Sequence, residues 1–307
     1  NAHLSYPNDF YIKITDKKYI KIVSANEILG EDVIDKFYQR HDIFFYVPHG
    51  QYNQFVDFQF RRRDLTQQEN SNEGEHAGVE TVEDLHMYLK EVGFNEAAVE
   101  TARNSLVETR ERFEKVKVLG PLLKRFKDLE GSFLYTHSYF ASVLAFVCRK
   151  HFDWLNHENL EKIQLGCMFH DLGHANEQSC VYESLSLNEI KNLPADIQLD
   201  VLGHTTALQE ELEASDLHDD VIKIIIGHHG VNGEDSYPKK VYSAEINHVF
   251  ALFMLVHEMS TRLLKSNFKD KDIERVLSEV EEKFSSGNFR KILPQFRIAM
   301  EKSFLIR

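Results

Sequence analysis

Apolar positions divide the chain into three parts with different periodicities. In residues 1–65, short apolar runs alternate with polar turns, a pattern typical of strands around an intervening helix. The predicted strands are 10–14, 19–23 and 43–47, and the predicted helix is 31–40. We interpret this part as a small α/β regulatory domain.

The second part begins with a polar and acidic segment, residues 66–80, which has no periodicity and is predicted to be a linker. From residue 82 to about 128, apolar residues recur at spacings of three, four and seven, which predicts helices. The charged stretch 108–115 favours a solvated helix face, with a dimerisation helix as the alternative. We treat residues 66–130 as an acidic linker and helical connector. The positions that carry the pattern are Leu85, Leu89, Val92, Val99, Ala102 and Leu106.

The third part, residues 131–307, is predicted to be helical almost throughout. Asp196, Asp216 and Ser243 are candidate N-caps, since their side-chain oxygens can accept the free amide protons of a first helical turn. The fold class is therefore mainly α: an all-helical domain preceded by a small α/β domain and a helical connector. The predicted helices are 132–151, 159–170, 196–214, 216–229, 245–266, 270–284 and 289–304.

Composition narrows the classes of function. The net charge of -13 argues against a binder of nucleic-acid polymers, so an anionic small substrate would need metal ions or a local basic patch. Cys148, Cys167 and Cys180 lie far apart, and the first two are interpreted as core residues in a reducing cytosol. The longest uncharged apolar segment, 249–256, is too short to span a bilayer, and no signal peptide is visible. We therefore expect a cytoplasmic protein without membrane insertion.

The candidate chemistry lies in histidines and one aspartate at the ends and on the faces of predicted helices. The doublets His170-Asp171 and His228-His229 each close a strongly apolar run. Such polar side chains cost free energy unless they are paired, and a carboxylate between imidazoles can bridge two metal ions. The candidate metal ligands are His137, His170, Asp171, His204, His228, His229 and His257. Four isolated histidines are instead interpreted as hydrogen-bonded core residues: His151, His157, His218 and His248.

From about residue 132 to 262, these ligands resemble the HD-GYP family of HD-domain metal-dependent phosphohydrolases. The order is the family's: a histidine on a first helix, the run His-Asp-Leu-Gly at 170–173, a further histidine, then the histidine pair. The turn 236–238 (Ser-Tyr-Pro) follows at the family's spacing. His257 lies twenty residues beyond Tyr237, where the family carries an aspartate. Residues 1–65 look like a small domain often found ahead of such units.

The resemblance implies an all-helical domain whose metal centre hydrolyses the phosphodiester of cyclic di-GMP. It implies that Asp171 bridges two metals and that a metal-bridged hydroxide attacks phosphorus. Nitrogen-rich ligation suits iron, manganese or zinc better than magnesium, and the resemblance favours iron. One metal would be completed by His137, His170 and His257, and the other by His204, His228 and His229.

Three departures from the family pattern concern the metal centre. His257 replaces a carboxylate, which would make the centre more positive by one unit and favour a divalent metal and a more acidic bound water. Phe133 takes the position of a glutamate that supports a third metal in some members, so two ions are expected. His174 replaces the family's lysine after His-Asp-x-Gly. Together with Asp171 it is a catalytic candidate, as a proton donor, with a solvated loop residue as the alternative.

Further departures concern the substrate. Ser236 replaces the glycine of the family's Gly-Tyr-Pro pattern, and Ala251 aligns with a phosphate-facing arginine. Tyr237, Lys239 and Lys240 are the candidate substrate contacts, with a charged turn facing water as the alternative. These changes leave metal binding untouched but weaken the case for cyclic di-GMP cleavage.

Three hypotheses of function follow. The first is a phosphodiesterase acting on cyclic di-GMP or a related cyclic dinucleotide. The second is a catalytically weak or inactive relative that serves as a nucleotide receptor or signalling scaffold. The third is a diiron protein with redox or oxygen chemistry, suggested by the histidine-rich ligand set. A homodimer or a signalling protein partner is compatible with each of them.

Overall fold

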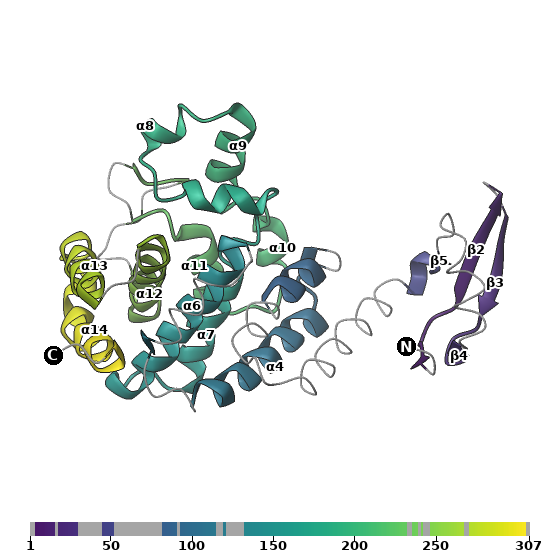
Figure 1. Cartoon of the computed structure of the whole chain (residues 1–307), viewed down its shortest axis with the longest axis horizontal. Helices are drawn as coiled ribbons and strands as arrows, with labels where there is room; N and C mark the ends of the chain where they lie inside the picture. Colours follow the sequence, from purple (N-terminus) through teal and green to yellow (C-terminus); the bar gives the residue numbers. More distant parts are fainter. Residues whose placement is uncertain are drawn as a thin grey trace. The chain divides into compact units, whose positions relative to one another are not determined.

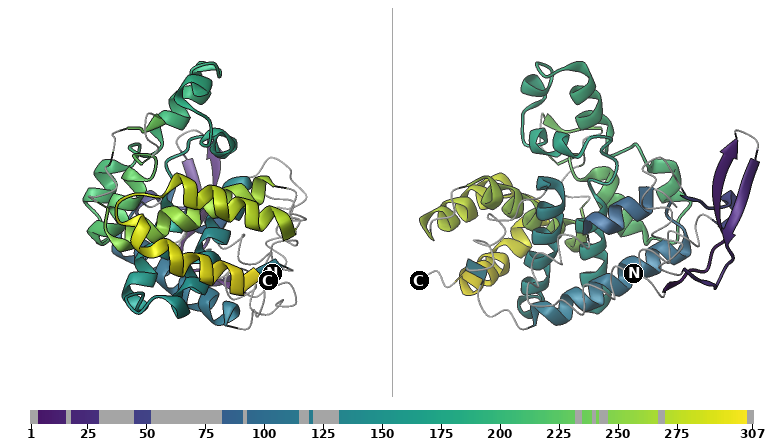
Figure 2. Two further views of the ribbon diagram at one scale, coloured as in Figure 1. Left: turned by 90° about the vertical axis from the view of Figure 1, so that its left-hand side faces the viewer. Right: turned by 45° about the vertical axis from the view of Figure 1, so that its right-hand side comes forward.

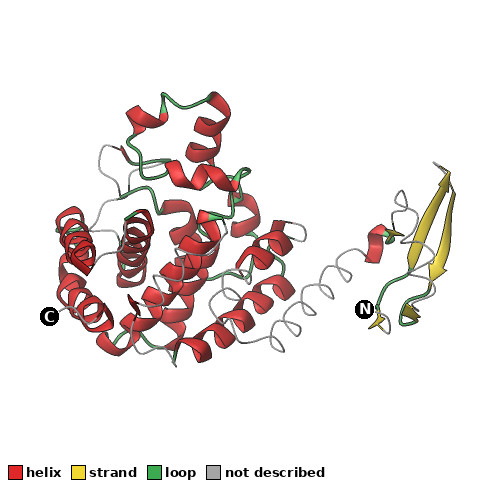
Figure 3. Cartoon of the chain, viewed as in Figure 1, coloured by secondary structure: helices red, strands yellow, loops and turns green. Residues whose placement is uncertain are grey.

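The computed structural model describes residues 4–15, 18–29, 45–51, 82–90, 93–114, 119–120, 132–231, 235–238, 241, 246–266 and 270–304. The chain forms two compact units, Asn1–Ser71 and Asn72–Arg307. Among the described residues, the strands belong to the first unit and the α-helices to the second (Figure 3). No described helix has the length and apolar character needed to cross a membrane.

The first unit contains two small antiparallel sheets. In the larger one, β2 pairs on one side with β3, with Phe10 opposite Val23, and on the other side with β5. The predicted strands 10–14 and 19–23 are confirmed, whereas the predicted helix 31–40 lies outside the described residues. The described elements are β1 (Leu4–Ser5), β2 (Phe10–Thr15), β3 (Lys18–Val23), β4 (Ile28–Leu29), β5 (Phe45–Tyr46) and the 3-10 helix η1 (His49–Gln51).

Three apolar helices form the centre of the second unit: α6 (Phe133–Cys148), α7 (His157–Phe169) and α12 (His248–Lys265). Each packs against the other two, and their contact faces are completely removed from solvent, as at Phe140 and Phe253. This burial of apolar area is the main force that holds the helices together. The mainly α fold class is therefore confirmed.

The remaining helices surround this centre (Figure 1). Figure 2 shows α13 and α14 in yellow as a pair near the C-terminus, and Arg297 of α14 forms an ion pair with Glu281 of α13 at 2.6 Å. The surrounding elements are α4 (Glu96–Phe113), η2 (Arg149–His151), η3 (Glu177–Tyr182), α8 (Leu187–Ile190), α9 (Ala195–Gly203), α10 (Gln209–Glu213), α11 (Asp219–Gly227), α13 (Asp270–Lys283) and α14 (Phe289–Phe304).

The helical connector packs onto the helices of the second unit. Residues 82–90 are helical, and α4 contacts both α6 and α7. Within the charged stretch 108–115, Arg110 is buried and its Nε donates to Oε1 of Gln164 at 2.7 Å. One side of this stretch is therefore an internal contact and not a solvated face. Val92 lies outside the described residues, while the other predicted apolar positions are buried as expected: Leu85, Leu89, Val99, Ala102 and Leu106.

One predicted helix is wrong in a way that matters for function. The segment 196–214 is two helices, α9 and α10, because the chain turns at His204. The apolar pattern continues through the turn, so periodicity alone does not reveal the break. The elements η3 and α8, between Glu177 and Ile190, were not predicted at all.

Two predicted N-caps and four histidine assignments are also wrong. Pro194 and His218 occupy the N-cap positions predicted for Asp196 and Asp216, and Ser243 lies outside the described residues. The four histidines interpreted as core residues are half-buried or exposed. They are His151, His157, His218 and His248.

Candidate metal centre

Three helices of the second unit end on a histidine. His170, His204 and His228 are the C-cap residues of α7, α9 and α11. Each ring turns back so that Nδ1 donates to the carbonyl three residues earlier in its own helix. A neutral imidazole with a proton on Nδ1 presents a lone pair on Nε2, the form that binds metals. The accepting carbonyls belong to Cys167, Val201 and Ile225, at 2.9, 2.8 and 2.9 Å.

Two further histidines come from the interior of long helices. His137 of α6 donates from Nδ1 to Oγ of Ser260 at 3.2 Å, and that hydroxyl donates to the carbonyl of His137 at 3.1 Å. Nε2 of His137 therefore also carries a lone pair. His257 of α12 is buried, and neither of its ring nitrogens has a hydrogen-bond partner among the described residues.

The five helices and their ends bring the six predicted histidine ligands together in two groups, with Asp171 near both. His137, His170 and His257 form the first group, and each offers a ring nitrogen within 4.8 Å of the others. Oδ2 of Asp171 lies 3.0 Å from Nε2 of His170, and Oδ1 lies 3.6 Å from Nε2 of His228. Asp171 is thus between the groups. The second group, also within 4.8 Å, consists of Glu183, His204, His228 and His229.

These residues fit bound cations. The Nε2 atoms of His137 and His170 are 3.1 Å apart, and those of His204 and His228 are 3.2 Å apart. Because the Nδ1 atoms carry the protons, neutral rings would oppose two lone pairs in a buried space, which is unfavourable without a proton or cation between them. Oδ1 of Asp171 is also buried and accepts no hydrogen bond from the described residues. The donor set therefore suits bound metal ions.

The electrostatic environment leaves several candidate ligands in the protonation states that bind metal ions. Burial lowers the pKa of His137 to about 3 and that of His228 to about 4, so both rings are neutral near neutral pH. Burial alone would raise the pKa of Asp171, but the neighbouring imidazoles, His170 foremost, hold it well below its usual range. Burial opposes the charged form of His170, but Asp171 raises its pKa. Without a metal, the ionised carboxylate therefore pairs with this ring, while His137 and His228 stay neutral.

Gly173 explains the shape of the loop after the His-Asp doublet. A Cβ atom at this position would lie 2.0 Å from the carbonyl oxygen of His204, closer than any real contact. The loop can therefore approach the end of α9 only with glycine. This contact joins the segment that carries Asp171 to the segment that carries His204.

Glu183 is a site residue that the sequence did not indicate. Its side chain is buried, with 8% exposure, and it follows η3 directly. Oε2 lies 3.4 Å from Nε2 of His229, and Oε1 lies 3.6 Å from Nε2 of His204. Burial and Asp171 would raise its pKa, yet the histidines around it hold the pKa well below its usual range. No spacing rule marks it, because the hydrophobic pattern does not predict η3.

His174 lies next to Glu183 and is 1% exposed, so the interpretation as a solvated loop residue is wrong. Its Nε2 bonds to Oε1 of Glu183, its Nδ1 lies 3.3 Å from Oδ2 of Asp200, and its ring stacks on His204 at 4.1 Å. Burial opposes the charged ring, but the Glu183 bond outweighs it and raises the pKa of His174 to about 9. Proton delivery to a leaving group would require one of these bonds to open.

The other predicted site residues have different positions. Tyr237 stacks on His229 with ring centres 4.5 Å apart, and it packs with Ile190 of α8 and Val201 of α9. Its hydroxyl has no hydrogen-bond partner among the described residues. Phe133 stacks on His137 at 5.7 Å. Lys239 and Lys240 lie outside the described residues.

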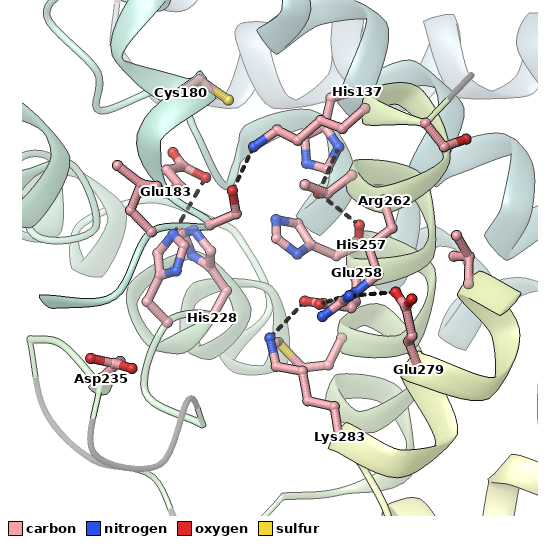
Figure 4. Close-up of a pocket in the computed structure, with 18 of the residues that line it drawn as sticks. His137, Cys180, Glu183, His228, Asp235, His257, Glu258, Arg262, Glu279 and Lys283 are labelled. Atoms are coloured by element: carbon pink, nitrogen blue, oxygen red, sulfur yellow. Dashed lines mark hydrogen bonds and ion pairs between the residues drawn. The ribbon is translucent and has the colours of Figure 1, made fainter. Parts of the chain in front are cut away.

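A pocket of about 510 Å³ opens beside the centre. Figure 4 shows Glu183 and His228 on one side of it and His137 and His257 on the other. Most of its basic side chains are neutralised: Arg262 and Lys283 bond to Glu258 at 2.6 and 2.7 Å, and Arg275 bonds to Glu279 at 2.6 Å.

Lys265 differs from these cations. Its Nζ donates to the carbonyl of Val181 at 2.9 Å and to Oγ of Ser184 at 2.7 Å. Both partners are neutral, and no described carboxylate forms an ion pair with it. Lys265 therefore brings an uncompensated positive charge to the pocket wall.

Comparisons with known proteins support the fold. No protein-family model and no curated protein matches the sequence. Among solved structures, the chain is similar to Bd1817, an HDG"Y"P protein from Bdellovibrio bacteriovorus, at 12% sequence identity and a TM-score of 0.51. The similarity covers 97% of this chain and 96% of that one. The chain thus has a mainly α, HD-type architecture. More narrowly, its fold is HD-GYP-like.

Proposed function

We propose that the chain is a metal-dependent phosphodiesterase that hydrolyses cyclic di-GMP or a related cyclic dinucleotide. The observation that carries this proposal is the convergence of six candidate histidine ligands, from five helices and their ends, around Asp171 in an HD-GYP-like fold. Apart from the adjacent pairs His170-Asp171 and His228-His229, the convergence is not imposed by sequence proximity, since the candidate ligands extend from His137 to His257.

The chain's donors would hold two divalent transition ions, with Asp171 contacting both. When bound, the ions would neutralise charge on phosphoryl oxygens and make water a better nucleophile. The nitrogen-rich set suits iron, manganese or zinc. Iron remains our first choice, on the family resemblance.

The pocket supplies the binding contacts. Its volume of about 510 Å³ is within the usual range for small-molecule sites. Lys265 is oriented by Val181 and Ser184, and its Nζ lies 5.4 Å from the centre of the Phe133 ring, beside the first ligand group. We assign it the phosphate contact that Ala251, which is completely buried, cannot make. The ring of Tyr237 stacks on the ring of His229 and helps to hold it in place.

The test uses full-length protein loaded anaerobically with Fe²⁺ or Mn²⁺ and incubated with cyclic di-GMP. Release of the linear dinucleotide, followed by chromatography, is expected for the wild type and absent for Asp171→Ala. His218→Ala is the matched control, because it removes a histidine at the surface end of α11. Wild-type protein with both metals bound and no turnover of any cyclic dinucleotide would refute the proposal.

A nucleotide receptor or signalling scaffold is the second candidate function. It is favoured by the departures from the family pattern at Ser236 and Ala251, which weaken the case for cleavage but leave the candidate metal ligands in place. This candidate predicts that cyclic di-GMP binds in calorimetry and persists unchanged. Absence of measurable heat would remove it.

A further inference from the structure

The second ligand group contains a carboxylate that the family resemblance does not supply. We propose that Glu183 is a ligand of the metal ion held by His204, His228 and His229, and that His174 and Asp200 position it. This inference rests on the metal centre of the proposed function. It concerns which residues hold the second ion, and so it does not depend on the substrate.

The distances place Glu183 within reach of the same ion as the imidazoles. One oxygen of Glu183 and one ring nitrogen from each of the three histidines lie within 4.8 Å of one another. Oε2 of Glu183 faces His229 at 3.4 Å, while Oδ1 of Asp171 approaches His204 at 3.9 Å. A cation among these imidazoles would therefore be within reach of both carboxylates.

The charge balance of the centre agrees with this assignment. His257, in place of a carboxylate, removes one negative charge from the first ligand group. Glu183 adds one negative charge to the second, so the centre has two carboxylates, Asp171 and Glu183. An ionised, buried carboxylate is costly unless cations or hydrogen bonds compensate it. Glu183 thus offsets the additional positive charge that the sequence predicted for the centre, although the sequence pattern did not identify Glu183.

A line of three side chains fixes the orientation of Glu183. Asp200 accepts from the backbone amides of Ala175 at 2.8 Å and Asn176 at 3.2 Å, and it contacts Nδ1 of His174 at 3.3 Å. The other ring nitrogen of His174 bonds to Oε1 of Glu183. This leaves Oε2 directed toward His229. Partners of this kind orient metal ligands in many proteins.

A simpler alternative is that Glu183 only compensates the charge of His174. Both accounts explain the bond between Glu183 and His174. They differ in whether the second metal ion needs the Glu183 carboxylate as a ligand. If Glu183 is only a counter-ion, removing its charge acts on the ions through space alone, and it does not selectively weaken one ion as the loss of a ligand does.

The experiment is a titration of the full chain with Mn²⁺ under anaerobic conditions, with free Mn²⁺ measured by electron paramagnetic resonance. We expect the wild type to bind two ions. Glu183→Gln should keep one ion at wild-type affinity and bind the other about 10- to 100-fold more weakly, the usual effect of disturbing a metal site. Glu258→Gln is the matched control, because Glu258 also lines the pocket but pairs with Arg262 and Lys283. It should keep both ions.

Each outcome decides the proposal. Two ions bound with unchanged affinity by Glu183→Gln would overturn it. If Glu183→Gln loses both ions, Glu183→Asp is tested next, because it keeps the negative charge but moves the carboxylate away from the ion. Selective weakening of one ion by Glu183→Asp would support the proposal. Two ions bound with unchanged affinity would contradict it. If the wild type binds no Mn²⁺, both the proposed metal centre and this inference are refuted. A wild type that binds two ions but hydrolyses nothing refutes only the phosphodiesterase.

Discussion

The two ligand groups on either side of Asp171 are built in different ways. In the first, His137 and His257 project from the interiors of α6 and α12, which pack directly on each other. In the second, His204 and His228 are helix C-caps, and Glu183 follows a 3-10 helix. Regular helix packing therefore fixes most of the first group, whereas turns and their tertiary contacts fix the second.

The groups also differ in charge. The first group consists of imidazoles, and its only carboxylate is the shared Asp171. The second has Glu183 in addition. When the other ligands are neutral, the affinity for a dication depends strongly on its anionic ligand. The loss of Asp171 should therefore weaken the two metal sites to different degrees. The following variants test this difference by Mn²⁺ titration and turnover.

The largest effect is expected for Asp171→Ala. It removes the only carboxylate of the first group but leaves Glu183 in the second, so the ion of the first group should be lost and the other retained weakly. Hydrolysis should be abolished, since the shared ligand is gone. Two ions bound with equal and undiminished affinity would show that the groups do not differ as described.

His257→Ala should weaken only the first group. The side chain contributes to no other group, and outer partners of metal ligands alone are worth about 10- to 100-fold in affinity, so a direct ligand should cost at least that. His248→Ala, at the exposed start of the same helix, is the control and should leave both ions in place. Equal weakening of both ions by His257→Ala would mean that the two groups act as one.

His174→Gln should weaken only the second group, by about tenfold, because Glu183 remains but loses the partner that orients it. The same titration measures this effect, with the ion of the first group as an internal control for folding. Weakening confined to the first group would contradict the proposed line from Asp200 to Glu183.

The smallest effect on the metals is expected for Lys265→Met, which keeps the length of the side chain and removes its charge. Both ions should bind as in the wild type, while the KM for the dinucleotide rises about tenfold, as for the loss of one charge-assisted contact. Lys283→Met is the control, because its charge is already compensated by Glu258. An unchanged KM in Lys265→Met would remove the phosphate contact from our proposal.

The sequence predicted the helical class and the strands of the first unit, because each depends on local periodicity. It proposed seven candidate ligands from the His-Asp and His-His doublets and from the resemblance to the HD-GYP family, and the structure places their side chains near one another. It failed at the turn after His204 and at exposed histidines such as His157, because periodicity does not distinguish a helix end at the surface from a buried one such as His170. It missed Glu183, whose neighbours in the chain show no helical period.

By itself, the sequence determined which side chains are available for chemistry and which helices carry most of them, since hydrophobic spacing encodes both. The tertiary structure alone decided that Glu183 joins three imidazoles and that His174 is buried between two carboxylates. Gly173 likewise admits the carbonyl of His204 at a distance that no side chain allows, which brings the loop after Asp171 against the end of α9. Which residues meet in this way depends on how the helices pack, and the spacing of residues along the sequence does not predict it.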